Sequence, residues 1–344
     1  LDRLVPAAAD LTGQAEGAGL RVTASTRIEF DGFVRLDYTV GPAAESAKLD
    51  KLYLEVILPE AEATHFCSTA GGWAATHDVT PERWSSQSSA SGMLKGDFVP
   101  YVWLTNSERA FLWFADSDRG WIHDPDKALP TIETTRADGH VTLRVHFIEI
   151  PSALDKPVAF TWGWQCFPSR PLPDGWRATF CANSPPMPHT TNTYFWADAD
   201  WAVLWPYYCS PFPWSMEKSR AELMRTPPDS PHRPCVGSIA HSIGRYMDYE
   251  RNQFPGLAVD WAAVPGQIGN SDVTASKGPN DFRLWHYQRW VREARFRGIY
   301  VDENYLGLEE NFLTGTAYFR PDGGLQRAYN YLGLREYVKR MKVM

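Results

Sequence analysis

The chain lacks the features of a membrane-spanning or nucleic-acid-binding protein. In its 344 residues no stretch approaches the roughly 18 consecutive apolar residues of a membrane span. The net charge is −7, the pI is near 5.7 and the basic residues are scattered, so no basic stripe is available to neutralise phosphates. We therefore expect neither a membrane span nor a nucleic-acid partner.

Paired cysteines and phosphate-binding glycine loops are also missing. The five cysteines are widely spaced and form no CxxC: Cys67, Cys166, Cys181, Cys209 and Cys235. They indicate neither a zinc site nor a dense disulfide framework, and they leave room for one disulfide without fixing its pairing. No GxGxxG or P-loop occurs. We expect no organic cofactor and no metal.

A signal peptide is likewise lacking at the N-terminus, "LDRLVPAAADL", which has neither an initiator Met nor a basic segment followed by a long apolar core. This pattern favours an internal start from which any export signal has been removed.

Aromatic residues are abundant. Fifteen Trp, fifteen Tyr and seventeen Phe make up 14% of the chain. Tryptophan has a flat apolar face and a polar N–H at one edge, which suits the CH-lined face of a sugar ring. Most single tryptophans nevertheless belong to a core, so this composition only suggests a carbohydrate ligand.

The first half has the pattern of an all-β domain. Seven segments are rich in Val, Ile, Thr and aromatics and are separated by polar turns, and no helix intervenes: 20–30, 32–40, 51–59, 98–105, 110–116, 140–150 and 156–164. In the sixth segment, Val141, Leu143, Val145 and Phe147 alternate with polar residues, as in a strand with one buried face. A polar turn over 106–109 joins two strands. We predict an antiparallel β-sandwich.

The pattern changes after the proline-rich stretch Pro168–Gly175, which predicts a boundary between domains 1–175 and 176–344. Strands are expected over 192–201, 234–243, 254–261 and 297–305, and helices over 215–224, 279–298 and 324–341.

The strongest of these helices is 279–298. Asn280 or Asp281 would cap its start, Leu284, Tyr287, Val291 and Ala294 would share its buried face, and Gly298 would follow its end.

Helices alternating with strands indicate a parallel sheet, and for a sugar-handling chain we predict a (β/α)8-type barrel. A complete barrel takes about 250 residues, whereas about 170 remain, so the barrel would be truncated after about four strands. A smaller open α/β domain is the alternative. A half-barrel exposes strand edges and apolar faces, which would require self-association or the missing C-terminal half.

The acidic pair Asp302-Glu303 lies at the end of the fourth predicted strand. Catalytic groups of such barrels lie at the carboxyl ends of the strands. Two close carboxylates repel each other when both are ionised, which raises one pKa and keeps a proton available for general acid catalysis. Asp260-Trp261 and Trp201 would lie at the ends of the third and first strands.

A tandem pair fits neither glycosidase arrangement with one carboxylate on each side of the sugar. It suits substrate assistance, in which Asp302 orients the 2-acetamido group as nucleophile and Glu303 protonates the leaving oxygen. Trp201, Trp205 and Trp261 are candidate sugar platforms, and Tyr300 and Tyr305 are candidate partners of the pair. His241 could face the same mouth, although a satisfied core histidine is the simpler interpretation.

Several of these segments resemble glycoside hydrolase family 123. "YVWLTNSERAFLWFADSDRGW" (Tyr101–Trp121) and "PLPDGWR" are similar to its N-terminal sandwich, and "FPGLAVDW" and "GIYVDENY" to the front of its barrel. The resemblance implies a retaining β-N-acetylgalactosaminidase with Asp302 and Glu303 as its catalytic pair. Together with the absence of a cytosolic motif, it also implies a secreted or periplasmic location. Asn304-Tyr305, a candidate substrate contact, departs from the family pattern and leaves another glycan substrate open.

Two other interpretations remain. The same fold could hydrolyse a glycoside without a 2-acetamido group, with Asp260 as nucleophile. The chain could also be a non-catalytic carbohydrate-binding or structural module, which the missing half of the barrel favours.

Overall fold

The computed structural model describes residues 3–5, 7–69, 74–77, 79–89, 98–124, 129–169, 179–182, 192–195, 232–234, 236–239, 274–294, 299–302, 308–313 and 315–343. The chain divides into two compact units, Leu1–Pro171 and Leu172–Met344. The division falls within the proline-rich stretch at which the sequence predicts a boundary.

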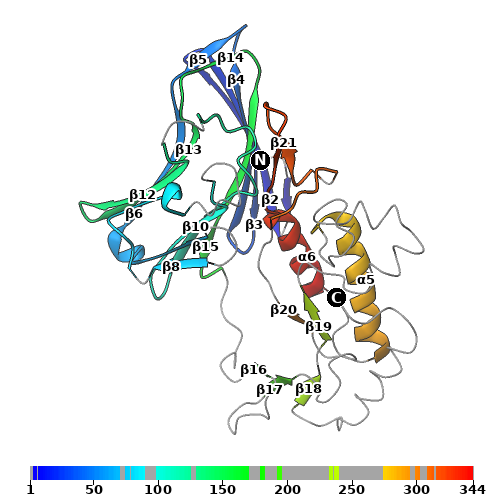
Figure 1. The fold of residues 1–344 in the computed structure, drawn as a ribbon. Helices are drawn as coiled ribbons and strands as arrows, with labels where there is room; N and C mark the ends of the chain where they lie inside the picture. The colour runs from blue at the N-terminus through cyan, green and yellow to red at the C-terminus, as the bar shows by residue number, and fades with distance from the viewer. Residues whose placement is uncertain are drawn as a thin grey trace. The chain divides into compact units, whose positions relative to one another are not determined.

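Unit 1 consists of antiparallel sheets (Figure 1). In sheet order, the nine-stranded sheet contains β1 (Arg3–Val5), β2 (Ala8–Gly17), β3 (Leu20–Glu29), β4 (Phe33–Pro42), β15 (Val158–Phe167), β11 (Ala110–Phe114), β10 (Tyr101–Thr105), β7 (His65–Thr69) and β8 (Ala74–His77). The four-stranded sheet contains β6 (Leu52–Pro59), β13 (His140–Ile148), β12 (Ile132–Ala137) and β9 (Arg83–Ser85).

Short elements complete this unit. β5 (Ala47–Leu49) and β14 (Ser152–Leu154) form a two-stranded ribbon. Two 3-10 turns, η1 (Glu60–Glu62) and η2 (Ser86–Ser89), follow β6 and β9.

All seven strands predicted in the first half are present as β3, β4, β6, β10, β11, β13 and β15. The alternation in β13 predicts its buried face correctly, since Val141, Leu143 and Val145 are fully buried and Phe147 nearly so. The register of β13 against β6 shifts after His146, which marks a bulge. His146 and Ile148 are buried as well.

The two large sheets pack face to face through aromatic side chains. Phe66 of β7 contacts Trp84 of β9 with ring centroids 4.8 Å apart, and Phe147 of β13 contacts Phe160 of β15 at 5.1 Å. Each contact joins one sheet to the other, so the core lies between the layers. This is the arrangement of the predicted antiparallel sandwich.

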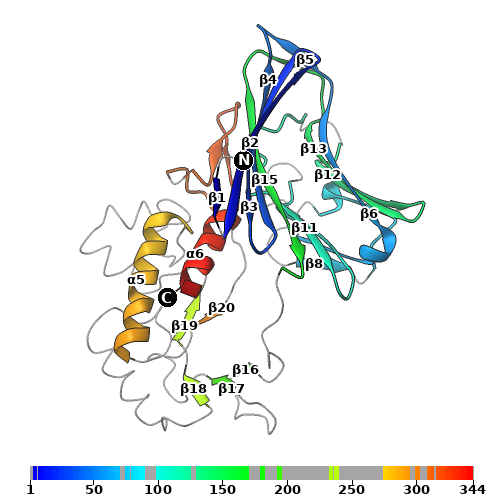
Figure 2. The same cartoon turned by 180° about the vertical axis from the view of Figure 1, so that it is seen from behind.

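Unit 2 is described through short strands and two α-helices (Figure 2). β16 (Thr179–Ala182), β17 (Asn192–Phe195) and β18 (His232–Pro234) form one parallel sheet. β19 (Val236–Ile239) and β20 (Ile299–Asp302) form a second. β21 (Tyr318–Phe319) pairs antiparallel with β22 (Leu325–Gln326). The helices are α5 (Lys277–Ala294) and α6 (Tyr331–Val343).

The prediction of a (β/α)8, or TIM, barrel is wrong. The described residues form mostly antiparallel sheets, and the parallel strands of unit 2 fall into two separate small sheets. A barrel in sequential order would place the predicted strand 254–261 between β19 and β20, yet these two pair directly, with Val236 opposite Ile299. The alternation of helices and strands in the sequence correctly predicted a parallel pair of strands. It did not predict which strands are neighbours in the sheet.

The predicted helix boundaries also need correction. α5 begins at Lys277, so Asn280 and Asp281 lie inside its first turns and do not cap it. α6 begins at Tyr331, because the start of the predicted helix 324–341 instead contains β22. Leu284 and Tyr287 are buried as expected. The predicted elements 215–224 and 254–261 lie outside the described residues, as do Gly298 and the side chains of Val291 and Ala294.

Candidate functional site

The predicted catalytic strand is present as β20, and its partner is β19. The two are parallel, with Ile239 opposite Asp302, so both carboxyl ends reach the same edge of the pair. Parallel neighbours need a long crossover connection, and α5 lies between them in the chain.

Two of the predicted site residues have a described backbone. Asp302 is the last residue of β20, and Tyr300 lies in the same strand opposite Gly237. Their side chains are outside the described part of the structure. The remaining predicted residues lie entirely outside it: Glu303, Asn304, Tyr305, His241, Asp260, Trp261, Trp201 and Trp205. Their convergence on one site stays a prediction.

Polar contacts fix the start of α5, the helix that precedes β20. The buried Asn280 side chain donates to the carbonyls of Ala275 at 2.9 Å and Gly333 at 3.3 Å, and its oxygen accepts from Arg283 at 2.6 Å. The Arg283 guanidinium lies 4.0 Å from the ring centroid of Tyr337 in α6. These contacts hold α5 and α6 side by side, as Figures 1 and 2 show.

Glu309 supports the same region from the segment between β20 and α6. One carboxylate oxygen accepts from the backbone N–H of Ala275 at 3.3 Å, and Asn330 donates to the carboxylate at 3.4 Å. Burial raises the pKa of the neighbouring residue Tyr329 to about 12. Tyr329 therefore stays protonated near neutral pH.

The most distinctive part of the family resemblance, the Asn-Ser-Glu-Arg stretch, is a structural turn between β10 and β11. The Asn106 side-chain oxygen accepts from the backbone N–H groups of Glu108 at 2.9 Å and Arg109 at 2.7 Å. Its amide group donates to the carbonyl of Ala61, and Arg109 pairs with Glu62 at 3.1 Å. These residues connect the β10–β11 hairpin to η1. The Asn-Ser-Glu-Arg sequence is therefore explained by its structural role in this turn.

The following Gly-Trp pair is also required by packing. Gly120 has φ of +86°, and a Cβ there would lie 2.3 Å from the carbonyl oxygen of Ala159. Trp121 packs edge-on against Phe98 at 5.5 Å and Phe147 at 5.2 Å. Both residues of this second motif thus serve the sandwich core.

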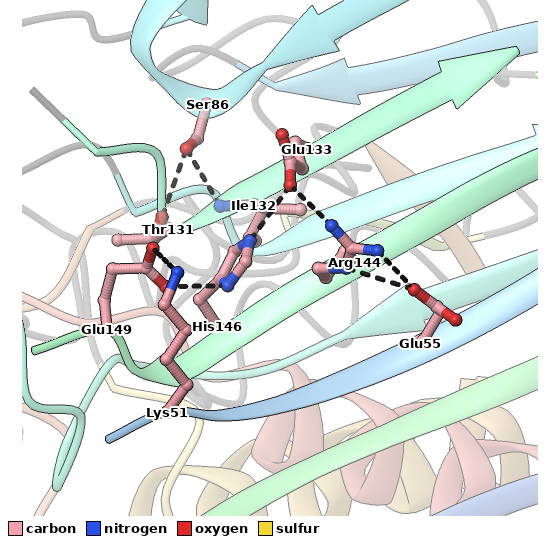
Figure 3. A network of polar contacts seen from close by, with 9 residues as sticks. All are labelled: Lys51, Glu55, Ser86, Thr131, Ile132, Glu133, Arg144, His146 and Glu149. Carbon is pink, nitrogen blue, oxygen red and sulfur yellow. Dashed lines mark hydrogen bonds and ion pairs between the residues drawn. The ribbon is translucent and has the colours of Figure 1, made fainter. Parts of the chain in front are cut away.

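The four-stranded sheet carries a charged network that the sequence analysis did not identify (Figure 3). His146 of β13 lies between two carboxylates, with Nε2 3.2 Å from Glu133 Oε1 and Nδ1 2.7 Å from Glu149 Oε2. Arg144 extends the network, with Nη1 3.4 Å from Glu133 and Nη2 2.5 Å from Glu55. A polar residue on the outer side of an alternating strand is expected to face solvent, whereas His146 is buried against Tyr53, Glu133 and Glu149.

Metal ligands and membrane helices are not found in the described part of the chain. No group of three or more His, Cys, Asp or Glu side chains there is placed to hold a metal ion. Neither α5 nor α6 is long and apolar enough to span a membrane. Cys67 and Cys166 are free thiols, and burial raises the pKa of each.

Comparison with models of known protein families finds no match, and neither does comparison with curated proteins. The functional argument therefore rests on the chain's own residues.

Proposed function

We propose that the chain is a retaining glycoside hydrolase that cleaves β-linked N-acetylhexosamine, with N-acetylgalactosamine as the first candidate, and that Asp302 and Glu303 are its catalytic pair. The observation that carries the proposal is the position of Asp302 at the carboxyl end of a strand in a parallel pair. In open parallel sheets, ligands bind in the crevice beyond the carboxyl ends of the strands. The resemblance of "GIYVDENY" to glycoside hydrolase family 123 supports the same assignment.

The proposed reaction uses the substrate's own acetamido group. The Asp302 carboxylate accepts a hydrogen bond from the acetamido N–H, and the acetamido carbonyl oxygen attacks C1. The bond from C1 to the leaving oxygen breaks as Glu303 transfers its proton to that oxygen. An oxazolinium intermediate results, and its positive charge is stabilised by Asp302.

The second half reverses these roles. Glu303, now a carboxylate, takes a proton from water as the water oxygen attacks C1 and the oxazolinium ring opens. Two displacements at C1 retain its configuration, and Glu303 is again protonated. The cycle needs no cofactor, since every proton and electron pair is supplied by Asp302, Glu303, water and substrate.

The test is hydrolysis of 4-nitrophenyl β-N-acetylgalactosaminide beside 4-nitrophenyl β-galactoside. Asp302→Asn and Glu303→Gln should each lower kcat/KM on the acetamido sugar by about 10² to 10⁴. Glu336→Gln, at an exposed carboxylate of α6, is the matched control and should keep the wild-type rate. Equal activity on both sugars, or an unaffected Glu303→Gln variant, would refute the proposal.

A second measurement isolates the nucleophile. Fluorination of the acetamido methyl group makes the carbonyl oxygen a poorer nucleophile, so the rate should fall steeply along the series from acetamido to trifluoroacetamido. An enzyme that used Asp260 as nucleophile would show little dependence on this series, and a 2-fluoro sugar would trap it as a glycosyl ester. Formation of such an ester would contradict substrate assistance.

A further inference from the structure

One edge of the four-stranded sheet is formed by β6, and this edge is long. The sheet order places β13 on one side of β6, and among the described residues no strand pairs with its other side. β6 has eight residues, whereas the other edge strands of the two large sheets, β1, β8 and β9, have three, four and three. Short edge strands are one way in which proteins prevent pairing between sheets. β6 lacks this protection.

The backbone of β6 presents hydrogen-bonding groups along this edge in a regular order. Directly after β6, the N–H of Glu60 donates to the carbonyl of Gly139 at 2.9 Å, on the side of β13. Backbone groups of an antiparallel strand alternate between its two neighbours, so the even-numbered residues of β6 bond to β13. The N–H and C=O groups of Tyr53, Glu55 and Ile57 therefore point to the open edge.

The side chains of β6 are mostly apolar on both faces of the strand. On the outer face of the sheet, Tyr53 and Ile57 are 49% and 57% exposed. On the face toward the core, Leu54, Val56 and Leu58 are only half-buried. A long apolar edge of this kind is a template for pairing with another strand.

We propose that β6 joins two copies of this chain: it pairs antiparallel with β6 of a second copy, about a twofold axis that passes between the two Val56 residues. A twofold axis brings the same surface of both copies together, and two identical strand edges related by it run antiparallel. The two four-stranded sheets then form one continuous sheet.

Charge and side-chain pattern select this register. Two registers pair β6 with itself over nearly its whole length and keep the core-facing side chains of both copies on one face, centred on Glu55 or on Val56. The first places the two Glu55 carboxylates directly opposite each other, which destabilises a sheet. The second leaves no like charges opposite: Val56 with Val56, Leu54 with Leu58, Tyr53 with Pro59 and Glu55 with Ile57.

The pairing also balances charge and covers apolar surface. Glu55 lies 2.5 Å from Arg144 within its own copy, so it brings no uncompensated charge to the contact (Figure 3). Leu54, Val56 and Leu58 continue the row of core side chains from one copy to the other. The contact thus combines backbone hydrogen bonds, which fix the register, with burial of apolar side chains.

The first test is the mass of the whole chain in solution. Sedimentation velocity over a series of concentrations should show a reversible equilibrium between monomer and dimer. A chain that stays monomeric up to about 100 μM would overturn the proposal.

A matched pair of variants tests the register. Ile57 is exposed in the single chain, and in the proposed dimer it lies opposite Glu55 of the other copy. Ile57→Glu and Ile57→Lys both remove the apolar side chain, but the first sets like charges opposite each other and the second sets opposite charges. The dissociation constant of Ile57→Glu should exceed that of Ile57→Lys at least about tenfold. Equal constants for the two variants would contradict this register and with it the proposal.

Cysteine cross-linking locates the axis. The two Val56 residues would form a pair without direct backbone hydrogen bonds, with Cα atoms about 4.5 Å apart, which a disulfide can bridge. Val56→Cys should therefore give a covalent dimer on mild oxidation. Leu54→Cys, which would lie opposite Leu58, should give no more than the wild-type chain, whose own five cysteines set the background. A dimer in solution that Val56→Cys does not cross-link would show that another surface joins the copies.

Discussion

The two units differ in what fills their interiors. Unit 1 encloses an apolar layer between long strands, with Trp113, Phe66, Phe160 and Ile132 almost fully buried. The described part of unit 2 has short strands and two helices, and many of its buried side chains are polar: Thr274, Asn280, Arg283, Asn311 and Gln326. Apolar packing is non-directional, whereas each buried polar group needs a particular partner. The units should therefore respond differently to substitution.

The apolar interior of unit 1 should give the largest effect. Trp113 is fully buried and lies 6.4 Å from Trp121 between ring centroids. Trp113→Ala leaves a large cavity and should lower the free energy of unfolding by about 3 to 5 kcal/mol. Chemical denaturation followed by far-ultraviolet circular dichroism measures this loss.

The matched variant is Trp113→Phe. The Trp113 indole N–H has no hydrogen-bond partner among the described residues, so phenylalanine keeps much of the ring volume and removes an unsatisfied donor. It should cost much less than alanine. A loss below about 1 kcal/mol for Trp113→Ala itself would contradict the assignment of Trp113 to a tightly packed core.

The polar interior of unit 2 should give a smaller but more specific effect. Asn280→Ala removes three hydrogen bonds and leaves the buried Arg283 without one of its acceptors. We expect a loss of about 2 to 3 kcal/mol. Asn280→Asp has nearly the same volume, yet it places an acceptor against the carbonyls of Ala275 and Gly333 and should also destabilise. Lys277→Ala removes only the surface ion pair with Asp281 at the start of the same helix, so it should cost much less than Asn280→Ala.

Denaturation curves of these variants distinguish directional from non-directional packing. If Asn280→Asp were as stable as the wild type, shape rather than hydrogen bonding would hold α5 against α6, and the contrast between the units would fail.

The sequence predicts unit 1 well because strand alternation is a local signal. β13 is found from Val141, Leu143 and Val145 alone. β2 was missed because "AADLTGQAEG" has no apolar alternation, and it is ordered by pairing with β3 across a turn in which Ala18 and Gly19 both have positive φ. The Asp138-Gly139 turn, also with positive φ at both residues, is a hairpin signal that could have identified β12.

The same local signals were less informative in unit 2. They located β17, β19 and β20 and the middle of α5, but strand order depends on contacts between residues far apart in sequence, and the direct pairing of β19 with β20 leaves no strand between them. Of the candidate site, the placement of Asp302 at a strand end is confirmed. His146 was missed because its neighbours Tyr53, Glu133 and Glu149 come from other parts of the chain or lie beyond the strand, and they are not visible in the periodicity of β13.

The smallest effect should come from the surface of α5. Asp281 hydrogen-bonds Lys277, and together with Arg340 this holds the pKa of Asp281 below its ordinary value of 3.8. A carboxyl group whose pKa is lower in the folded state stabilises the fold above its ordinary value and loses that contribution as the pH falls through the folded value. Because Asp281 and Arg340 are more than a third exposed and Lys277 is largely exposed, solvent screens these ion pairs, and Asp281→Asn should cost only about 0.5 kcal/mol near neutral pH.

This small loss has a pH signature that the core variants lack. The difference in unfolding free energy between wild type and Asp281→Asn should be constant from pH 5 to pH 7 and should shrink below about pH 4, where the wild-type carboxylate becomes protonated. High salt should reduce it as well. A difference that grew on acidification, or one as large as that of Asn280→Ala, would place Asp281 in the directional interior of unit 2 rather than on its solvated face.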